Sequence, residues 1–446
     1  MAYSFLLVVV TLLFLRPSEM MEGLGEARLY EAAILTCLAF SAMPVAKRLM
    51  PGALVNQPIT ACLLTFAAMV GVSNLLQFDF GELVFWEMTV FKVMVLYLLV
   101  ATNVNSPRRL RYFLGWLGIL ILAVALLAIL QFHGVIAIPA LTPFEQREID
   151  PQTGEATVFP RMCGPGIFHD PNDLCVVMAL GIAISVYWLG ERKLGELRFA
   201  WLAPLGVCAY GVALTLSRGG MMAVLAGLAV VSGTRFGAGK SLALAALLLP
   251  IVVLIGASRA GGLGFSSEED TSQSRIQLWS DGLQLFQHSP VTGIGAGQFA
   301  EEVGAVVHNT FLHAFAEVGF IGGSALLGAF GIGILAIRRL TKIAKRRQHE
   351  PLESPAAKTL LRMQPVVLAI VVSFVVGVLS LSRPYSPMTY LVLGLAAAYL
   401  QVAEKTWPGS APRLSPRMVT WIAGLGMAYL VCARLFVTVF VRWGGT

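Results

Sequence analysis

The sequence predicts an all-α polytopic membrane protein, on the basis of its composition, its hydropathy and the spacing of its apolar runs. Hydrophobic residues make up 57% of the 446 residues and charged residues only 13%, with a mean hydropathy of +0.76. Soluble domains carry about 25% charged residues, so the composition excludes a soluble enzyme, a disordered chain and a nucleic-acid-binding domain. Apolar runs of about 17–25 residues, long enough to cross a bilayer, recur along most of the chain.

About 12–13 membrane-spanning helices are expected, within a single integral-membrane domain covering residues 1–446. The first apolar run is short, but it lacks a preceding basic residue and a small-residue cleavage site, so we interpret it as a span and not as a cleaved signal peptide. The predicted spans are Tyr3–Leu15, Leu29–Met43, Ile59–Phe78, Leu83–Ala101, Tyr112–Phe132, Leu174–Leu189, Phe199–Leu216, Gly219–Ser232, Ser241–Gly256, Asn309–Ile337, Met363–Leu381, Pro387–Val402 and Val419–Phe440.

The basic residues predict the topology of these spans. The loops that follow even-numbered spans hold 21 Lys and Arg residues, whereas the loops that follow odd-numbered spans hold 8. Because Lys and Arg accumulate in cytoplasmic loops, the amino terminus is expected on the cytoplasmic side. The net charge of +7 is then explained by basic residues that orient the chain in the membrane. The two long loops, 134–173 and 257–308, are then both periplasmic.

These two loops are expected to contain short helices. A long helix in the first loop is prevented by Pro143, Pro151, Pro160, Pro165 and Pro171. In the second, Ile276, Trp279, Leu283 and Phe286 recur at helical spacing and predict an amphipathic helix over Ser274–His288. Such a helix either lies at the membrane surface or packs against neighbouring spans, and the sequence favours neither alternative.

The end of the first loop holds an arginine and two carboxylates. Asp170 and Asp173, three residues apart, could hold a divalent metal, but the stretch Asp170-Pro171 before an apolar run is typical of a helix start. We therefore favour the capping role for Asp170. Arg161 has no comparable structural role, which makes it a candidate site residue.

An abrupt turn between two apolar runs carries Ser217-Arg218-Gly219-Gly220. Ionisable residues at a membrane boundary are costly and are functional candidates, although an arginine there can also extend to the lipid headgroups. Glycines allow a close backbone approach, and the start of the following helix offers unpaired N–H groups. These features favour an anion site at Arg218.

Beyond Arg275, the chain contains the glycine run Gly293-Ile-Gly295-Ala-Gly297. A nucleotide-binding loop would follow a strand, whereas this run lies in an outer loop between apolar segments. The glycines are therefore predicted to let the loop turn closely over the membrane.

A histidine opens the long apolar run that follows, within the sequence His308-Asn309. His313 and Glu317 lie four residues apart, so they are expected to pair on one face of the helix. His308 stands at the mouth of this helix, on the same predicted side of the membrane as the three arginines. It is the candidate catalytic histidine.

Arginines and a histidine on the outer face indicate transfer of a group from a diphosphate. Arginine binds phosphate oxygens with two parallel hydrogen bonds, and histidine is the usual general base near neutral pH. Nucleotides are scarce outside the cell, so the diphosphate is expected on a lipid. A glycolipid transporter would place charges at several depths, yet the spans hold mainly Glu87, Lys92, Glu317 and Arg434. A non-catalytic scaffold is a third alternative.

At these residues the chain resembles the O-antigen ligase and polysaccharide polymerase superfamily of bacterial membrane glycosyltransferases. The resemblance rests on Arg161 to Asn172, Ser217-Arg218-Gly219, Arg275 through Phe299, and the spacing His308-Asn-x9-Gly-x3-Gly. The Arg16-Pro17-Ser-Glu19 stretch after the first span is also similar.

The resemblance implies a GT-C-like membrane fold, usually with twelve spans, and an active site facing the periplasm of the bacterial inner membrane. It implies metal-independent, inverting transfer without a cofactor. The donor would be an undecaprenyl-diphosphate-linked glycan and the acceptor lipid A–core oligosaccharide; a polymerase that joins lipid-linked repeat units is the alternative. His308 would be catalytic, and Arg161, Arg218 and Arg275 would bind the donor diphosphate.

Overall fold

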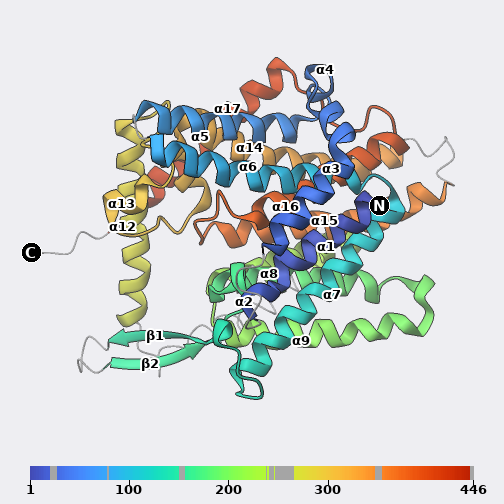
Figure 1. Ribbon diagram of the computed structural model, residues 1–446, viewed down its shortest axis with the longest axis horizontal. Helices are drawn as coiled ribbons and strands as arrows, with labels where there is room; N and C mark the ends of the chain where they lie inside the picture. Colours follow the sequence, from blue (N-terminus) through green and yellow to red (C-terminus); the bar gives the residue numbers. More distant parts are fainter. Residues whose placement is uncertain are drawn as a thin grey trace, which may run out of the picture. The chain divides into compact units, whose positions relative to one another are not determined.

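A computed structural model of the chain describes residues 1–20, 28–77, 80–149, 156–237, 239–240, 246, 266–346 and 354–441. The chain divides into two compact units, each assembled from three separate segments. Unit 1 comprises Met1–Ala42, Asn103–Ser267 and Ala344–Gly377, and unit 2 comprises Met43–Thr102, Glu268–Ile343 and Val378–Thr446. Both units are built almost entirely of helices (Figure 1).

Ten helices in the described part of the chain are long and apolar enough to cross a membrane. This finding confirms the predicted all-α polytopic fold. The ten are α1–α2 (Ala2–Met20), α3 (Leu29–Leu49), α5 (Pro58–Leu76), α6 (Phe80–Asn103), α7 (Pro107–Phe132), α8 (Pro171–Leu189), η3–α9 (Arg192–Thr215), the Thr310–Leu340 part of α14, α15 (Pro355–Val378) and α17 (Pro416–Phe440).

Two further predicted spans are also helical. The helix α10 (Arg218–Phe236) has a shorter apolar stretch, Arg218–Thr234. The helix α16 (Pro387–Thr406) is buried along most of its length. The remaining predicted span, Ser241–Gly256, lies outside the described residues apart from Ala246.

The helix α8 lies at the centre of unit 1, where it packs against α7, α9 and α10. Its residues are apolar on every side, as expected of a helix surrounded by other helices. Small residues allow the close packing: a Cβ on Gly181 would lie 2.7 Å from Ile121 of α7, and a Cβ on Gly220 of α10 would overlap Cys175 of α8. This packing holds the start of α8 beside the start of α10.

The loop before α8 contains the short 3-10 helices η1 (Pro139–Leu141) and η2 (Gly166–Phe168). It also contains a hairpin that the sequence analysis did not predict. The strands β1 (Phe144–Ile149) and β2 (Ala156–Arg161) pair antiparallel, with Phe144 opposite Arg161. The hairpin therefore places Arg161 at its base, directly before the turn into α8.

The core of unit 2 is formed by α5, α6, α14 (Thr310–Arg346) and α16, with the short helix α4 (Pro51–Leu54) before α5. Tyr97 of α6 and Tyr399 of α16 are fully buried. Gly394 of α16 allows α6 to approach, because a Cβ there would lie 3.0 Å from Val100. The core packing explains why α16 is apolar without a polar face.

The predicted amphipathic helix is α12 (Ser266–His288), which runs crosswise to α5, α6 and α14 (Figure 1). Its apolar residues pack against the neighbouring helices: the Trp279 ring lies 5.4 Å from Phe436 of α17, and the Phe286 ring lies 6.0 Å from Phe315 of α14. Of the two alternatives, packing against spans is therefore observed. The short helix α13 (Gln298–Val303) follows it.

Candidate active site

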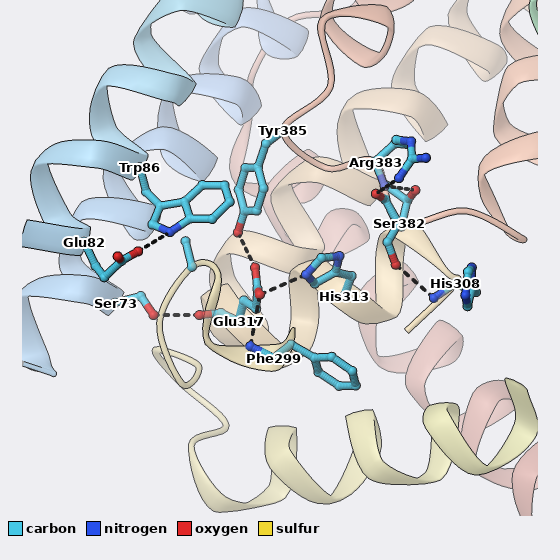
Figure 2. Close-up of polar contacts among 12 residues, drawn as sticks. Ser73, Glu82, Trp86, Phe299, His308, His313, Glu317, Ser382, Arg383 and Tyr385 are labelled. Carbon is cyan, nitrogen blue, oxygen red and sulfur yellow. Dashed lines mark hydrogen bonds and ion pairs between the residues drawn. The ribbon is translucent and has the colours of Figure 1, made fainter. Parts of the chain in front are cut away.

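His308 lies directly before α14, in a backbone conformation that side-chain-bearing residues rarely adopt. Its φ is 54°, and its backbone N–H donates a 2.9 Å hydrogen bond to Ser382 Oγ (Figure 2). A left-handed conformation at a non-glycine residue costs roughly 1–3 kcal/mol and persists only where the surroundings impose it. At His308 the bond to Ser382 is one such restraint.

Asn309 caps the helix that His308 precedes. Its Oδ1 accepts hydrogen bonds of 3.2 Å from the backbone N–H groups of Phe311 and Leu312, and a 2.7 Å bond from the Tyr429 hydroxyl. An asparagine oxygen in this position satisfies helix donors that have no partner inside the helix. The His308 imidazole is therefore not needed for capping.

A second connection joins the start of α14 to the loop between α15 and α16. Thr310 Oγ1 donates to the Leu381 carbonyl at 2.6 Å, and the Arg383 backbone N–H donates to Thr310 Oγ1 at 2.9 Å. Together with the His308–Ser382 bond, these contacts fix residues 308–310 against residues 381–383. The sequence analysis did not identify this loop as part of the site.

Glu317 is fully buried one helical turn beyond His313. Its Oε1 lies 2.9 Å from His313 Nε2, which confirms the predicted pairing, and its Oε2 accepts a 2.8 Å bond from the Tyr385 hydroxyl (Figure 2). The Phe299 N–H also donates to Oε1, at 3.2 Å. A buried carboxylate requires such donors. Glu317 therefore connects α13, α14 and the 381–386 loop.

Tyr385 lies in that loop and is a donor throughout the physiological pH range. Burial, and then the neighbouring Glu317 carboxylate, raise the pKa of the Tyr385 hydroxyl well above its ordinary value. The hydroxyl therefore stays protonated and keeps donating to Glu317. No helical or strand periodicity marks Tyr385, and only its place in a loop predicted to face outward could have drawn attention to it.

The helix α14 is interrupted at Gly319, where φ is 71° and ψ is −171°. The interruption leaves two carbonyls of α14 available to the glycine run: Ile294 N–H donates to the Ala316 carbonyl and Gly295 N–H to the Glu317 carbonyl, both at 3.1 Å. Ser73 Oγ also donates to the Glu317 carbonyl, at 2.6 Å.

The loop that carries the glycine run packs so closely against the kink of α14 that neither Gly293 nor Gly319 has room for a side chain. A Cβ on Gly293 would overlap the Glu317 carbonyl, and a Cβ on Gly319 would overlap the Val291 carbonyl. Gly293, Gly295 and Gly297 all have positive φ. The close turn predicted for this loop is observed, and its partner is the kink of α14, while its place over the membrane stays a prediction.

Arg275 lies on α12 and is half-buried, in the same unit as His308. The helix that carries it is held by a hydrophobic cluster that includes Leu283, Phe299 and Leu312. The packing of α12 against this cluster therefore fixes where Arg275 lies within unit 2.

Arg218 is the first residue of α10, in unit 1. Ser217 caps this helix, with its Oγ accepting from the Gly220 N–H at 3.2 Å, and the preceding Leu216 has a φ of 51°. Gly220 contacts α8, so its small size serves helix packing and is not evidence for a ligand.

Arg161 is only 5% exposed, and protein groups surround its guanidinium. Its Nε donates to the Thr215 carbonyl at 2.9 Å, one terminal nitrogen donates to Gln146 Oε1 at 3.1 Å, and the other donates to Asn172 Oδ1 at 3.0 Å. Arg161 thereby connects β1, the start of α8 and the end of α9, the helix that leads to Arg218.

Asp170 is the N-cap of α8, as predicted. Its Oδ1 accepts from the backbone and side-chain nitrogens of Asn172 at 2.8 and 2.9 Å, and Pro171 occupies the first helical position. Within the described ranges, no group of three or more His, Cys, Asp or Glu side chains is placed to hold a metal ion.

The predicted site residues fall into two pairs. Arg161 and Arg218 belong to unit 1, and Arg275 and His308 belong to unit 2. Within unit 1, Arg161 supports the turn that leads into Arg218. Convergence of all four residues in one cavity stays a prediction.

These features define a polytopic membrane protein whose polar motifs lie at the starts of apolar helices. Residues 203–327 match the O-antigen ligase family, which confirms the resemblance to the O-antigen ligase and polysaccharide polymerase superfamily. The exopolysaccharide production protein ExoQ of Rhizobium meliloti (strain 1021) is 27% identical over 191 residues, covering 35% of this chain and 42% of that protein. The chain thus spans less than half of this relative. No solved structure matches the chain.

Proposed function

We propose that the protein is an O-antigen ligase, which transfers a glycan from undecaprenyl diphosphate to a sugar hydroxyl of lipid A–core oligosaccharide. The reaction takes place at the periplasmic face of the bacterial inner membrane. The family match supports this proposal, because residues 203–327 contain Arg218, Arg275 and His308. The membrane helices support it as well, since both substrates are carried by lipids.

The strained backbone of His308 is the observation that carries the proposal. In the described part of the chain, non-glycine residues with positive φ are Arg16, Leu216 and His308. Arg16 ends the first span, Leu216 precedes Ser217-Arg218, and His308 opens the His-Asn motif. Strained backbone persists where surrounding structure imposes it and clusters at functional sites. Arg16 and Leu216 are helix C-caps, where a left-handed residue is common, whereas His308 precedes α14, so its conformation supports a functional role for the His-Asn motif.

In the proposed reaction, the acceptor hydroxyl oxygen forms a bond to the anomeric carbon on the face opposite the diphosphate. The bond from that carbon to the diphosphate oxygen breaks, and the configuration inverts. His308 takes the hydroxyl proton as general base. Undecaprenyl diphosphate leaves, and Arg218 and Arg275 stabilise the negative charge that develops on it. Neither a metal nor a cofactor takes part.

Arg161 acts, in this proposal, by positioning the arginine turn. Its three nitrogens each donate to a protein acceptor, Thr215, Gln146 or Asn172, and its burial leaves little of the guanidinium accessible to a diphosphate. Its bond to Thr215 restrains the end of α9, three residues before Arg218. This role replaces direct diphosphate binding as our preferred account of Arg161.

A polymerase that joins lipid-linked repeat units is the second proposal, because the curated relative is named for exopolysaccharide production. The two activities share the donor and differ in the acceptor. Deletion of the gene, followed by a lipopolysaccharide gel, distinguishes them. Loss of long-chain lipopolysaccharide while lipid-linked polymer accumulates supports the ligase, and loss of the polymer itself supports the polymerase.

Purified protein tests both proposals against transport. The donor glycan is labelled and incubated with lipid A–core and protein in detergent, where no second compartment exists. Transfer of the label to lipid A–core supports the ligase, and elongation of the lipid-linked glycan supports the polymerase. If well-folded protein forms neither labelled product, both proposals are contradicted.

A further inference from the structure

A cavity of about 200 Å³ lies in unit 2, among the end of α3, the start of α5 and the end of α16. Its apolar wall includes Pro58, Ile59 and Leu400. Its polar wall includes Arg48 and Lys405. The loops beside it follow even-numbered spans, so it is expected at the cytoplasmic ends of the helices, away from the predicted active site.

Arg48 is a buried cation in this cavity, with only 6% of its surface exposed. One terminal nitrogen donates to Gln401 Oε1 at 2.9 Å and to the Ala101 carbonyl at 3.2 Å, and the Tyr97 hydroxyl also interacts with the guanidinium. All three partners are neutral. In the described residues, Arg48 Nε is buried without a hydrogen-bond partner.

Glu404, the carboxylate that lines the cavity, is engaged elsewhere. It accepts a 2.7 Å bond from the Gly409 N–H and a 2.6 Å bond from the Ala411 N–H. Among the described residues, it does not form an ion pair with Arg48. The lining thus has one satisfied carboxylate, the buried Arg48 and the exposed Lys405, so it carries a net positive charge.

A structural role for Arg48 accounts for only part of these observations. The bond to Ala101 satisfies a carbonyl near the end of α6, and the bond to Gln401 links α3 to α16. Cations stabilise helix carboxyl ends in this way. Neither bond uses Nε, and neither explains why a second cation borders the same cavity. A buried charge without a counter-ion is costly and is a functional candidate in a membrane protein.

We propose that this cavity binds a phosphate group through Arg48 and Lys405. A planar guanidinium suits phosphate oxygens because it can donate two parallel hydrogen bonds. Basic pockets between helices at the cytoplasmic side are places where anionic lipid headgroups bind. The headgroup of an anionic phospholipid is the expected source, since the apolar wall can accommodate the glycerol and the first carbons of the chains.

The test measures the unfolding temperature of the full-length protein in a non-ionic detergent. The probes are dioctanoyl phosphatidylglycerol, dioctanoyl phosphatidylcholine and inorganic phosphate, compared at equal ionic strength with sodium chloride. We expect phosphatidylglycerol to raise the unfolding temperature by several degrees, with saturation, and phosphatidylcholine to leave it unchanged. The shift should disappear in Arg48→Gln and persist in the control Arg413→Gln, which removes an exposed arginine from the same end of the unit.

A saturable shift with inorganic phosphate that also depends on Arg48 assigns the site to a soluble phosphate compound. A shift that is equal in Arg48→Gln and in the unchanged protein overturns the proposal, as does the absence of any shift. If Arg48→Gln does not fold, Lys405→Gln and Ala411→Trp serve instead. The first removes the exposed cation, and the second narrows the cavity without touching a partner of Arg48. Retention of the full shift in both variants overturns the proposal.

Discussion

The Tyr385 hydroxyl donates a 2.8 Å hydrogen bond to Glu317 Oε2, and this bond joins the loop that holds His308 to the interior of α14. The same loop carries Ser382, which accepts from the His308 backbone. Two residues 68 positions apart therefore determine how firmly the loop is held. The first prediction removes this single bond.

Tyr385→Phe should lower both thermal stability and transfer. A hydrogen bond to a charged group contributes about 1.5–3 kcal/mol, and a weaker loop would hold His308 less firmly. Tyr390→Phe is the matched control, because in the described structure the Tyr390 hydroxyl is buried without a partner. Unfolding temperature and turnover are measured for both variants. Equal effects of the two substitutions would contradict a specific role for the Tyr385–Glu317 bond.

His308→Ala should reduce transfer by about 10²–10⁴-fold, the usual contribution of a general base. The unfolding temperature should stay close to that of the unchanged protein, because Asn309 and not His308 caps α14. Asn309→Ala provides the contrast and should lower stability by about 1 kcal/mol. Transfer of labelled glycan and the unfolding temperature are both measured. Full activity of His308→Ala would contradict the catalytic role of His308 and favour a non-catalytic scaffold.

Arg218→Lys should also be severe although the charge is kept. An ammonium cannot reproduce the planar pair of donors, and loss of one charge-assisted hydrogen bond of about 1.5–3 kcal/mol corresponds to roughly a 10–100-fold change in rate. Arg192→Lys is the control, since Arg192 is an exposed arginine of the same unit. Unchanged turnover in Arg218→Lys would exclude bidentate diphosphate binding at this position.

Gly319→Ala tests the link between the helix kink and the glycine run. The positive φ alone costs an alanine about 1–3 kcal/mol, and the new Cβ would overlap the Val291 carbonyl. Gly424→Ala is the control: a Cβ on Gly424 meets nothing within 4 Å, and alanine favours the helix by about 0.5–1 kcal/mol. The unfolding temperature should therefore fall in the first variant and stay equal or rise in the second. A stable, active Gly319→Ala would show that the kink is dispensable.

The sequence was sufficient to predict what depends on local spacing. Apolar runs predicted the helices, the four-residue spacing predicted the His313–Glu317 pair, and the pattern Asp170-Pro171 predicted the helix cap. Each of these features involves residues within one or two helical turns of each other. Local spacing therefore identified the helices and the start of α8, whereas α7 and α15 begin at Pro107 and Pro355, before the predicted Tyr112 and Met363.

Contacts between distant residues could not be predicted in this way. The bond from His308 to Ser382 joins residues 74 positions apart, and the bond from Tyr385 to Glu317 leaves no periodic signal. The hairpin that ends at Arg161 was also missed, because Pro160 lies within its second strand and proline normally argues against a strand. In the sequence Arg161 consequently looked like a ligand-binding residue, whereas the structure surrounds it with protein acceptors.

The role of Arg161 can be decided by comparing its substitution with substitutions of its neutral partners. If Arg161 positions the turn before Arg218, Asn172→Ala and Gln146→Ala should each reproduce part of the effect of Arg161→Gln on turnover. Neither partner carries a charge that a diphosphate would meet. Direct diphosphate binding predicts instead that Arg161→Gln raises the KM for the donor while both partner variants behave normally. Steady-state kinetics at varied donor concentration separate these outcomes, and unchanged kinetics in all three variants would leave Arg161 without any role in transfer.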